Sequence, residues 1–290
     1  MKFDMEEFTL RSHKYQLAIL VLLYNKKPSE STSFISLDKT LQQLNTSYNN
    51  VQICLWNNGP DKFDTKDDLT TSYYSTAIVE TINNESLSVI YNKFLARFDS
   101  EKYLILDHDS FVSSEYINEC LNDSFEYIIP TIITQNGVQS PKIYNLKSYV
   151  NNKTLLGIGS GICLTNHACS MVKNKFKTVF DERFYLYGVD STFFLRLNKI
   201  GQADKIKISK STIFHSLSKF EDENKTIKKF REKERSYDQA LTLRYYFSVF
   251  TFVTTFKKII GCIFLNKSDI NLFIFLAALV SGKHYKSIKS

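Results

Sequence analysis

The segment Gln16–Tyr24 (QLAILVLLY) is an unbroken apolar run that stops at Asn25. A strand with one solvated face alternates apolar and polar residues, so this run predicts a strand that is buried on both faces. A second run, Val51–Trp56 (VQICLW), ends at the turn-forming residues Asn57-Asn58-Gly59-Pro60. Between the two runs lie apolar residues spaced three and four apart, as on the inner face of a helix: Phe34, Leu37, Leu41 and Leu44. Strand, helix and strand in this order predict a parallel α/β sheet.

The same order continues along the chain. Ala77–Ile82 is typical of a strand, Leu87–Phe98 of a helix, and Tyr103–Leu106 (YLIL) of a short buried strand that ends in Asp107-His108-Asp109-Ser110. Tyr127–Ile133 predicts a further strand. Ligands of open α/β sheets bind beyond the carboxyl ends of the strands, so the acidic turn after YLIL is where we expect a site.

The composition predicts a cytosolic protein that is large enough to be an enzyme. The chain has 290 residues, 43% of them hydrophobic, which is enough for one large domain. Its five cysteines are odd in number, scattered and never in a C-x-x-C pair, which fits reduced thiols better than disulfides or a zinc site. The first 16 residues carry acids and have no apolar run, so we expect no secretory signal.

Positive charge is concentrated near the end of the chain. Residues 244–290 hold seven basic residues and one acidic residue, which leaves the rest of the +7 chain about neutral. This distribution argues against a general nucleic-acid-binding surface and for contact with anionic lipid. Three apolar segments there, Tyr245–Phe256, Ile259–Leu265 and Leu272–Val280, are shorter than the roughly 18–20 residues that span a bilayer. We expect interfacial helices, with a helical cap on the core as the alternative.

The Asp107-x-Asp109 pair carries the clearest chemical signal. Residues two apart at a strand end project to the same side, so both carboxylates can face one divalent ion. Mg²⁺ or Mn²⁺ bound by one or two carboxylates takes further ligands from water and substrate phosphates, which suits a diphosphate leaving group. The alternative is a pair of solvated aspartates that only form a turn.

A second acidic stretch, Phe180–Asp190 (FDERFYLYGVD), leads into the amphipathic segment Ser191–Leu197. This arrangement predicts a helix with Asp190 near its beginning. A carboxylate at that position can be a helix cap, a catalytic group, or both.

These motifs together resemble the family 2 glycosyltransferases of bacterial surface polysaccharide synthesis, especially the rhamnosyltransferase-like branch. The matches run from about residue 16 to 286, in the family's order. They are Tyr24-Asn25 for T-Y-N, Asn57-Asn58-Gly59 for D-N-G-S, both asparagines of Asn84–Asn92, Asp107-His108-Asp109 for D-x-D, Ser160-Gly161, Phe180–Arg196 and His215. Three positions depart from the pattern: Asn57 replaces an aspartate, Ser86 a glycine and Val189 a glutamate.

The resemblance implies the GT-A fold, a Rossmann-like, mostly parallel sheet flanked by helices. The charge and the apolar segments of the tail add a C-terminal helical extension that associates with membranes. The catalytic domain would span residues 1–235, with a nucleotide-sugar half at about 16–110 and an acceptor half at about 111–220. The extension would span residues 236–290.

The matched positions also imply roles for individual residues. Those that would bind the nucleotide sugar are Tyr24, Asn25, Asn57, Asn84, Asn92 and Asp107. Those that would bind Mg²⁺ or Mn²⁺ are Asp107, Asp109 and His215, and those on the acceptor side are Ser160, Gly161, Tyr187 and Gly188. Asp190 would be the catalytic base of a single displacement, which inverts configuration.

The implied reaction moves a hexose from a nucleotide-diphosphate sugar, with dTDP-rhamnose as the family-level candidate, to a hydroxyl of a lipid-linked saccharide. It belongs to polysaccharide synthesis of the O-antigen or capsule type, and the enzyme would be peripheral at the cytoplasmic face of the cell membrane. Asn57 retains an amide that can hydrogen-bond a pyrimidine edge.

Two rival functions remain. A haloacid-dehalogenase-like phosphatase also places D-x-D after an apolar strand, but it expects Thr or Val where Phe111 stands, and its motif lies in the first strand. A catalytically silent, membrane-bound scaffold of the same fold is the non-enzymatic rival, favoured by Asn57 and Val189 where the family has acids. Metal-dependent hydrolysis of a nucleotide sugar would separate enzyme from scaffold.

Overall fold

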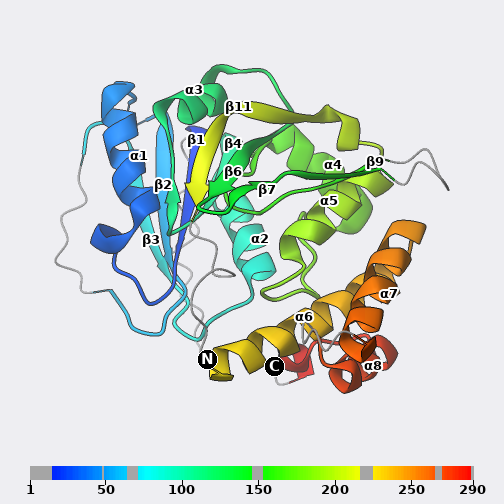
Figure 1. Ribbon diagram of the computed structural model, residues 1–290. Coiled ribbons are helices and arrows are strands. Elements are labelled where there is room, and N and C mark those ends of the chain that lie inside the picture. The colour runs from blue at the N-terminus through cyan, green and yellow to red at the C-terminus, as the bar shows by residue number, and fades with distance from the viewer. Residues whose placement is uncertain are drawn as a thin grey trace.

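The computed structural model describes residues 15–47, 49–63, 71–145, 153–215, 225–264 and 270–288. In this part of the chain one nine-stranded sheet forms the centre, with the order β3-β2-β1-β4-β10-β6-β11-β5, and β7 pairs with β6 (Figure 1). Its strands are β1 (Tyr15–Leu23), β2 (Val51–Asn57), β3 (Ser75–Glu80), β4 (Ser100–Asp107), β5 (Ser110–Phe111), β6 (Tyr127–Thr134), β7 (Gly137–Ser140), β10 (Cys163–Thr165) and β11 (Ile206–His215). A separate hairpin pairs β8 (Lys142–Asn145) with β9 (Lys153–Leu156).

Most strands of the central sheet run in one direction. β3, β2, β1 and β4 are parallel neighbours, and β6 and β11 share their direction, because β10 is antiparallel to both β4 and β6. The described helices are α1 (Thr32–Gln43), α2 (Leu87–Arg97), α3 (Ser114–Asn122), α4 (Asn166–Phe176), α5 (Val189–Lys199), α6 (Lys225–Tyr245), α7 (Val249–Phe264) and α8 (Leu272–Ser281), with short 3₁₀ turns at Pro28–Glu30, Ala203–Lys205 and Tyr285–Ile288. The predicted α/β class, a mostly parallel sheet flanked by helices, is confirmed.

β1 shows why helices cover both faces of the sheet. Residues Leu17 to Leu23 of this strand are all buried. Leu17, Ile19 and Val21 join a core that includes α1 and α3, whereas Ala18, Leu20 and Leu22 join a core that includes α2, α4 and α5. This alternation is the two-residue period of a strand, and Figure 1 shows the two helix layers on opposite sides.

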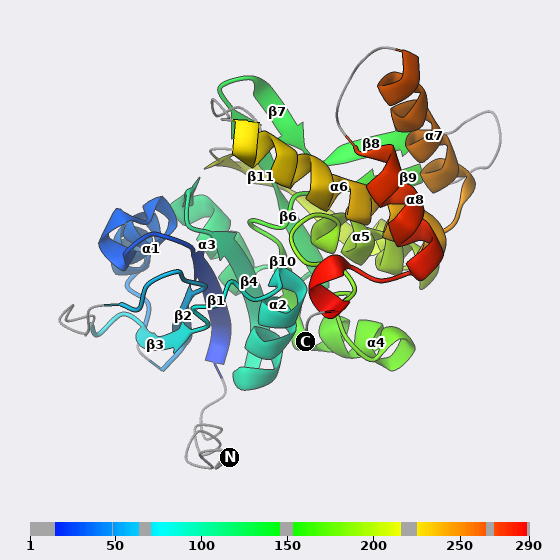
Figure 2. The same ribbon diagram turned by 90° about the horizontal axis from the view of Figure 1, so that it is seen from below.

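Three helices follow the sheet domain and lie together on one side of the molecule (Figure 2). α6 packs on α8 through a small apolar core of Ala240, Ile270, Phe275 and Ala278. The predicted domain boundary at residue 235 lies inside α6, which is continuous from Lys225 to Tyr245. None of the described helices is both long enough and apolar enough to cross a membrane.

α7 joins two of the apolar segments seen in the sequence. Lys257-Lys258 separates Tyr245–Phe256 from Ile259–Leu265, and α7 continues through both lysines. Both side chains are exposed, so the helix carries them on its solvent side without burying charge.

A buried ion-pair network fastens the end of α6 to the sheet domain. Asp181 and Arg196 are both buried and pair at 3.3 Å, and Arg183 approaches the same carboxylate at 2.5 Å. The Tyr246 hydroxyl donates to Asp181 at 2.6 Å and accepts from Arg196 Nε at 2.8 Å. Burial alone would raise the pKa of Asp181, but the hydrogen bonds from Arg183 and Tyr246 outweigh it and hold this pKa below its ordinary value.

Replacing Asp181 with Ala should therefore destabilise the protein by about 3–5 kcal/mol, because Arg196 would remain buried without its partner. Chemical denaturation measures the loss. Lys93→Ala is the matched control: Lys93 pairs with Glu85 at 2.7 Å, but its side chain is half exposed, so its loss should cost less than about 1 kcal/mol. Equal effects of the two substitutions would contradict the role of the Asp181 network.

Candidate active site

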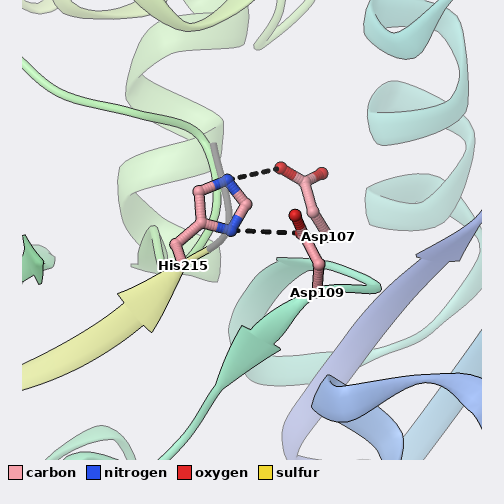
Figure 3. Close-up of side chains that lie close together, drawn as sticks. All are labelled: Asp107, Asp109 and His215. Carbon is pink, nitrogen blue, oxygen red and sulfur yellow. Dashed lines mark ion pairs between the residues drawn. The ribbon is translucent and has the colours of Figure 1, made fainter. Parts of the chain in front are cut away.

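The acidic turn lies at the carboxyl end of β4, as expected. Asp107 is the last residue of β4, and Asp109 precedes the two-residue strand β5. β11 pairs antiparallel with β5, opposing His215 to Ser110. This pairing brings His215 over the turn, so that Asp107, Asp109 and His215 each offer a ligand atom within 4.8 Å of the other two (Figure 3).

His215 is buried and faces both aspartates. Its Nδ1 lies 3.1 Å from Asp109 Oδ1 and 2.9 Å from the Ser110 hydroxyl, and its Nε2 lies 3.8 Å from Asp107 Oδ2. Burial alone would lower the pKa of His215, but the hydrogen bond with Asp109 and the charge of Asp107 raise it. Two carboxylates and one imidazole form a donor set that fits a divalent cation such as Mg²⁺ or Mn²⁺.

The start of α1 holds the turn in place. Ser31 donates its hydroxyl to the His108 carbonyl at 3.0 Å, and the Ser33 backbone N–H donates to the same oxygen at 3.1 Å. The Ser33 hydroxyl also donates to the carbonyls of Asp107 and Ser110, and it accepts from the Ser110 N–H at 3.0 Å. These two serines were not among the predicted site residues. Ser31 is the N-cap of α1, a role that a sequence can signal, but its contact with a turn some 70 residues away leaves no pattern.

Ser160 and Gly161, predicted on the acceptor side, lie directly behind Asp107. Ser160 is completely buried, and its hydroxyl accepts from the Asp107 N–H at 3.0 Å and contacts the Ser110 hydroxyl at 2.6 Å. The Gly161 N–H donates to the Ile105 carbonyl at 2.7 Å. In this structure the two residues position the acidic turn, and their contact with an acceptor stays a prediction.

Asp190 lies in the first turn of α5, as predicted, and follows Gly188, whose φ is +84°. A Cβ on Gly159 would stand 2.3 Å from Asp190 Oδ1, so the absence of a side chain there lets the backbone approach the carboxylate. Burial and, next, the negative charge of Asp107 raise the pKa of Asp190 to about 7, while a hydrogen bond from the Gly159 backbone opposes them. A carboxylate with a pKa near neutrality is suited to accept a proton.

A further acid, Asp238 of α6, lies beside the same loop. A Cβ on Gly188 would stand 2.3 Å from Asp238 Oδ1. The charge of Asp238 also contributes to the raised pKa of Asp190. Tyr187 of this loop lies under the guanidinium of Arg235, 5.3 Å from the ring centre. Sequence reasoning missed Asp238 because it lies outside the residues expected to form the catalytic domain.

Of the residues predicted to bind the nucleotide, Tyr24 and Asn25 follow β1, and Tyr24 is about half exposed. Asn58 donates to the Asn84 side chain at 3.2 Å, which joins the end of β2 to the loop between β3 and α2. Asn57 is buried: its amide donates to the Asp61 carbonyl at 2.7 Å and to Glu80 at 3.1 Å, and its oxygen accepts from the Gly59 N–H.

The side chain of Asn92, on α2, is likewise hydrogen-bonded to the backbone of a neighbouring loop. It donates to the Phe180 carbonyl at 2.9 Å and accepts from the Phe180 N–H at 3.0 Å, which ties the 180–190 loop to α2. Both Asn57 and Asn92 thus support the loops of the site, and their contact with a nucleotide stays a prediction.

No family model and no curated protein match the sequence. Solved structures of S. aureus TarS are similar at a low level: TarS 1-349 is 10% identical, with a TM-score of 0.48 and coverage of 93% of each chain. TarS 1-349 in complex with UDP-GlcNAc gives 10% identity, a TM-score of 0.47 and the same coverage. Another structure of S. aureus TarS is 11% identical, with a TM-score of 0.47. The similarity covers 92% of this chain and 53% of that chain. A likeness of this degree identifies neither a family nor a ligand, so the function rests on the site itself.

Asp190→Asn should raise the melting temperature at about pH 8 in metal-free buffer. The folded-state pKa of Asp190, about 7, lies above its ordinary value of 3.8, so the folded state favours the protonated carboxyl. The stability contributed by that form is lost as pH rises through about 7, whereas the asparagine stays neutral. The gain should shrink as the pH is lowered to about 5.

Thermal melts of both proteins across this range give the comparison. Asp204→Asn, a change at an exposed acid, is the control and should shift stability little at any pH. A gain from Asp190→Asn that did not vary with pH would contradict the raised pKa.

Proposed function

We propose that the chain is a metal-dependent, inverting glycosyltransferase of the GT-A type, a hexosyltransferase that uses a nucleotide-diphosphate sugar. The observation that carries this proposal is the position of Asp190 near the Asp107, Asp109 and His215 cluster. The backbone of Gly159 lies against the Asp190 carboxylate, and the next residue, Ser160, accepts from the Asp107 N–H at 3.0 Å. Burial and, next, the charge of Asp107 raise the pKa of Asp190. A cation-binding set and a carboxylate with a pKa of about 7 then meet at the carboxyl end of the sheet.

Asp107, Asp109 and His215 would hold Mg²⁺ or Mn²⁺, which when bound neutralises the charge of a departing diphosphate. The hydrogen bond between Ser110 and His215 Nδ1 orients the imidazole, and Ser33 and Ser160 fix the backbone of the turn. Asp190 accepts the proton of the acceptor hydroxyl as that oxygen attacks the anomeric carbon. The Gly159 N–H keeps the carboxylate oriented during this transfer.

The finer assignments are supported by the sequence motifs. We propose a lipid-linked saccharide as the acceptor, dTDP-rhamnose as the first donor to test, and a role in O-antigen or capsule-type synthesis at the cytoplasmic face of the cell membrane. Tyr24, Asn25, Asn57, Asn84 and Asn92 are proposed on the nucleotide side, and Tyr187 and Gly188 on the acceptor side, close to Asp238 and Arg235.

Asp109→Ala should abolish metal-dependent hydrolysis of the donor, because it removes a proposed direct ligand. Asp107→Ala should also suppress turnover strongly, acting through the ribose or a metal-bound water. A screen of nucleotide sugars with Mn²⁺ or Mg²⁺, followed by release of the nucleoside diphosphate, measures both variants, with Asp204→Ala as the exposed-acid control. Unchanged hydrolysis by both variants in the presence of a chelator would exclude the metal-dependent function. No hydrolysis of any donor by the unaltered protein would favour the silent scaffold.

Asp190→Asn should fold, bind donor and metal, and lose transfer by about 10²–10⁴-fold, because it keeps the size of the side chain but not the proton acceptor. Calorimetry of donor binding and donor turnover measure the two properties separately. Ser191→Ala, which changes the adjacent residue and removes a bond to the Gly188 carbonyl, is the matched control and should retain turnover. Near-normal turnover by Asp190→Asn would assign Asp190 a structural role alone.

A further inference from the structure

α7 carries an uncovered apolar stripe. Its five members recur every three or four residues, which places them on one face of the helix. Each is between 37% and 57% exposed: Val249, Phe252, Phe256, Ile260 and Ile263. The opposite face is buried and small, with Thr251, Thr255 and Gly261.

α8 repeats the pattern. Phe273, Leu276 and Val280 are 87%, 56% and 78% exposed, at the spacing of one helix face. Phe275 and Ala278 point the other way and pack on α6. Figures 1 and 2 both place α7 and α8 at the same end of the molecule. Soluble monomers rarely leave apolar surface of this extent uncovered, so the two stripes indicate an interaction surface.

The positive charge around α7 and α8 favours a negatively charged partner. The described residues 246–264 and 270–288 contain four lysines and no acid: Lys257, Lys258, Lys283 and Lys286. Two copies of this chain packed through the same surface would oppose positive to positive. A bilayer with anionic headgroups, by contrast, supplies hydrocarbon for the apolar stripes and negative charge for the lysines. At 16 and 10 residues, α7 and α8 are too short to span it and suit an orientation parallel to its surface.

We propose that the exposed face of α7 and α8 docks on an anionic lipid bilayer, with Phe252, Phe256 and Phe273 inserted and the exposed Lys257 and Lys283 at the headgroups. Residues just before α7 and just after α8 contact the loop that leads to Asp190. The Arg183 guanidinium lies 3.7 Å from the Tyr245 ring centre, and His284 stacks on Tyr185 at 4.5 Å.

These contacts hold the acceptor side of the site at a fixed distance from the membrane. The benefit to transfer onto a lipid-linked acceptor rests on the proposed function, whereas docking itself does not.

Co-sedimentation of the full chain with vesicles tests the proposal. We expect binding to vesicles of equal parts phosphatidylcholine and phosphatidylglycerol, weaker binding to phosphatidylcholine alone, and loss of binding as salt is raised. The double change Phe252→Ser and Phe256→Ser should weaken binding at least about tenfold. Changing Lys257 and Lys283 to Gln should weaken it about fivefold for each lysine.

Matched controls are Val138→Ser, at a residue that is 63% exposed on the β7 hairpin, and Lys175→Gln on α4, and both should bind like the unaltered protein. Phe273→Ser in α8 gives a second variant if the α7 double change impairs folding, which melting curves detect.

Absence of binding to the anionic vesicles at low salt would overturn the proposal. So would unchanged binding by the α7 and α8 variants, or a concentration-dependent dimer that Phe252→Ser abolishes. Because donor hydrolysis is measured without vesicles, failure of docking and failure of the proposed function remain distinguishable.

Discussion

The burial of β1 on both faces, from Leu17 to Leu23, is the constraint on which the other features of the structure depend. A strand with apolar side chains on both faces needs a layer of helices on each, and its parallel neighbours β2 and β4 need helical connections to return the chain. All three strands therefore end at one edge of the sheet. The turn after β4, the end of β1 and the start of α1 meet there for this reason, and Ser33 links the start of α1 to the turn.

The sequence predicted those parts of the fold whose side chains are unambiguously apolar. The runs that became β1, β2, β4 and β6 are buried, so their composition reports their environment. β10 has only three residues, and β11 (IKISKSTIFH), next to the last strand of the sheet, carries lysines and serines. Neither segment therefore has the unbroken apolar composition that predicts a buried strand. α7 spans two apolar segments that lysines separate in the sequence, because a helix can carry Lys257 and Lys258 on its exposed side.

Within the candidate site, local motifs predicted the acids and a family pattern predicted His215. The groups that position them could not be predicted in this way. Ser33 meets the acidic turn, and Asp238 meets Gly188, only because the fold brings distant segments together. For Asn57 and Asn92, the motif predicted contact with a nucleotide sugar, and the structure shows both amides engaged with the backbone of neighbouring loops.

The contacts of the Asp190 loop also affect the order in which the protein is completed. Tyr246 binds Asp181, and His284, which pairs with the buried Glu234 at 3.4 Å, stacks on Tyr185. All of these partners follow the loop in the chain, and segments emerge from the ribosome in sequence order. During synthesis the sheet can form first. The loop before Asp190 lacks these contacts until α6, Tyr246 and the residues after α8 have been added. A nascent chain released before that point would have the acidic turn and Asp190 but not the contacts that hold the loop before Asp190 in place.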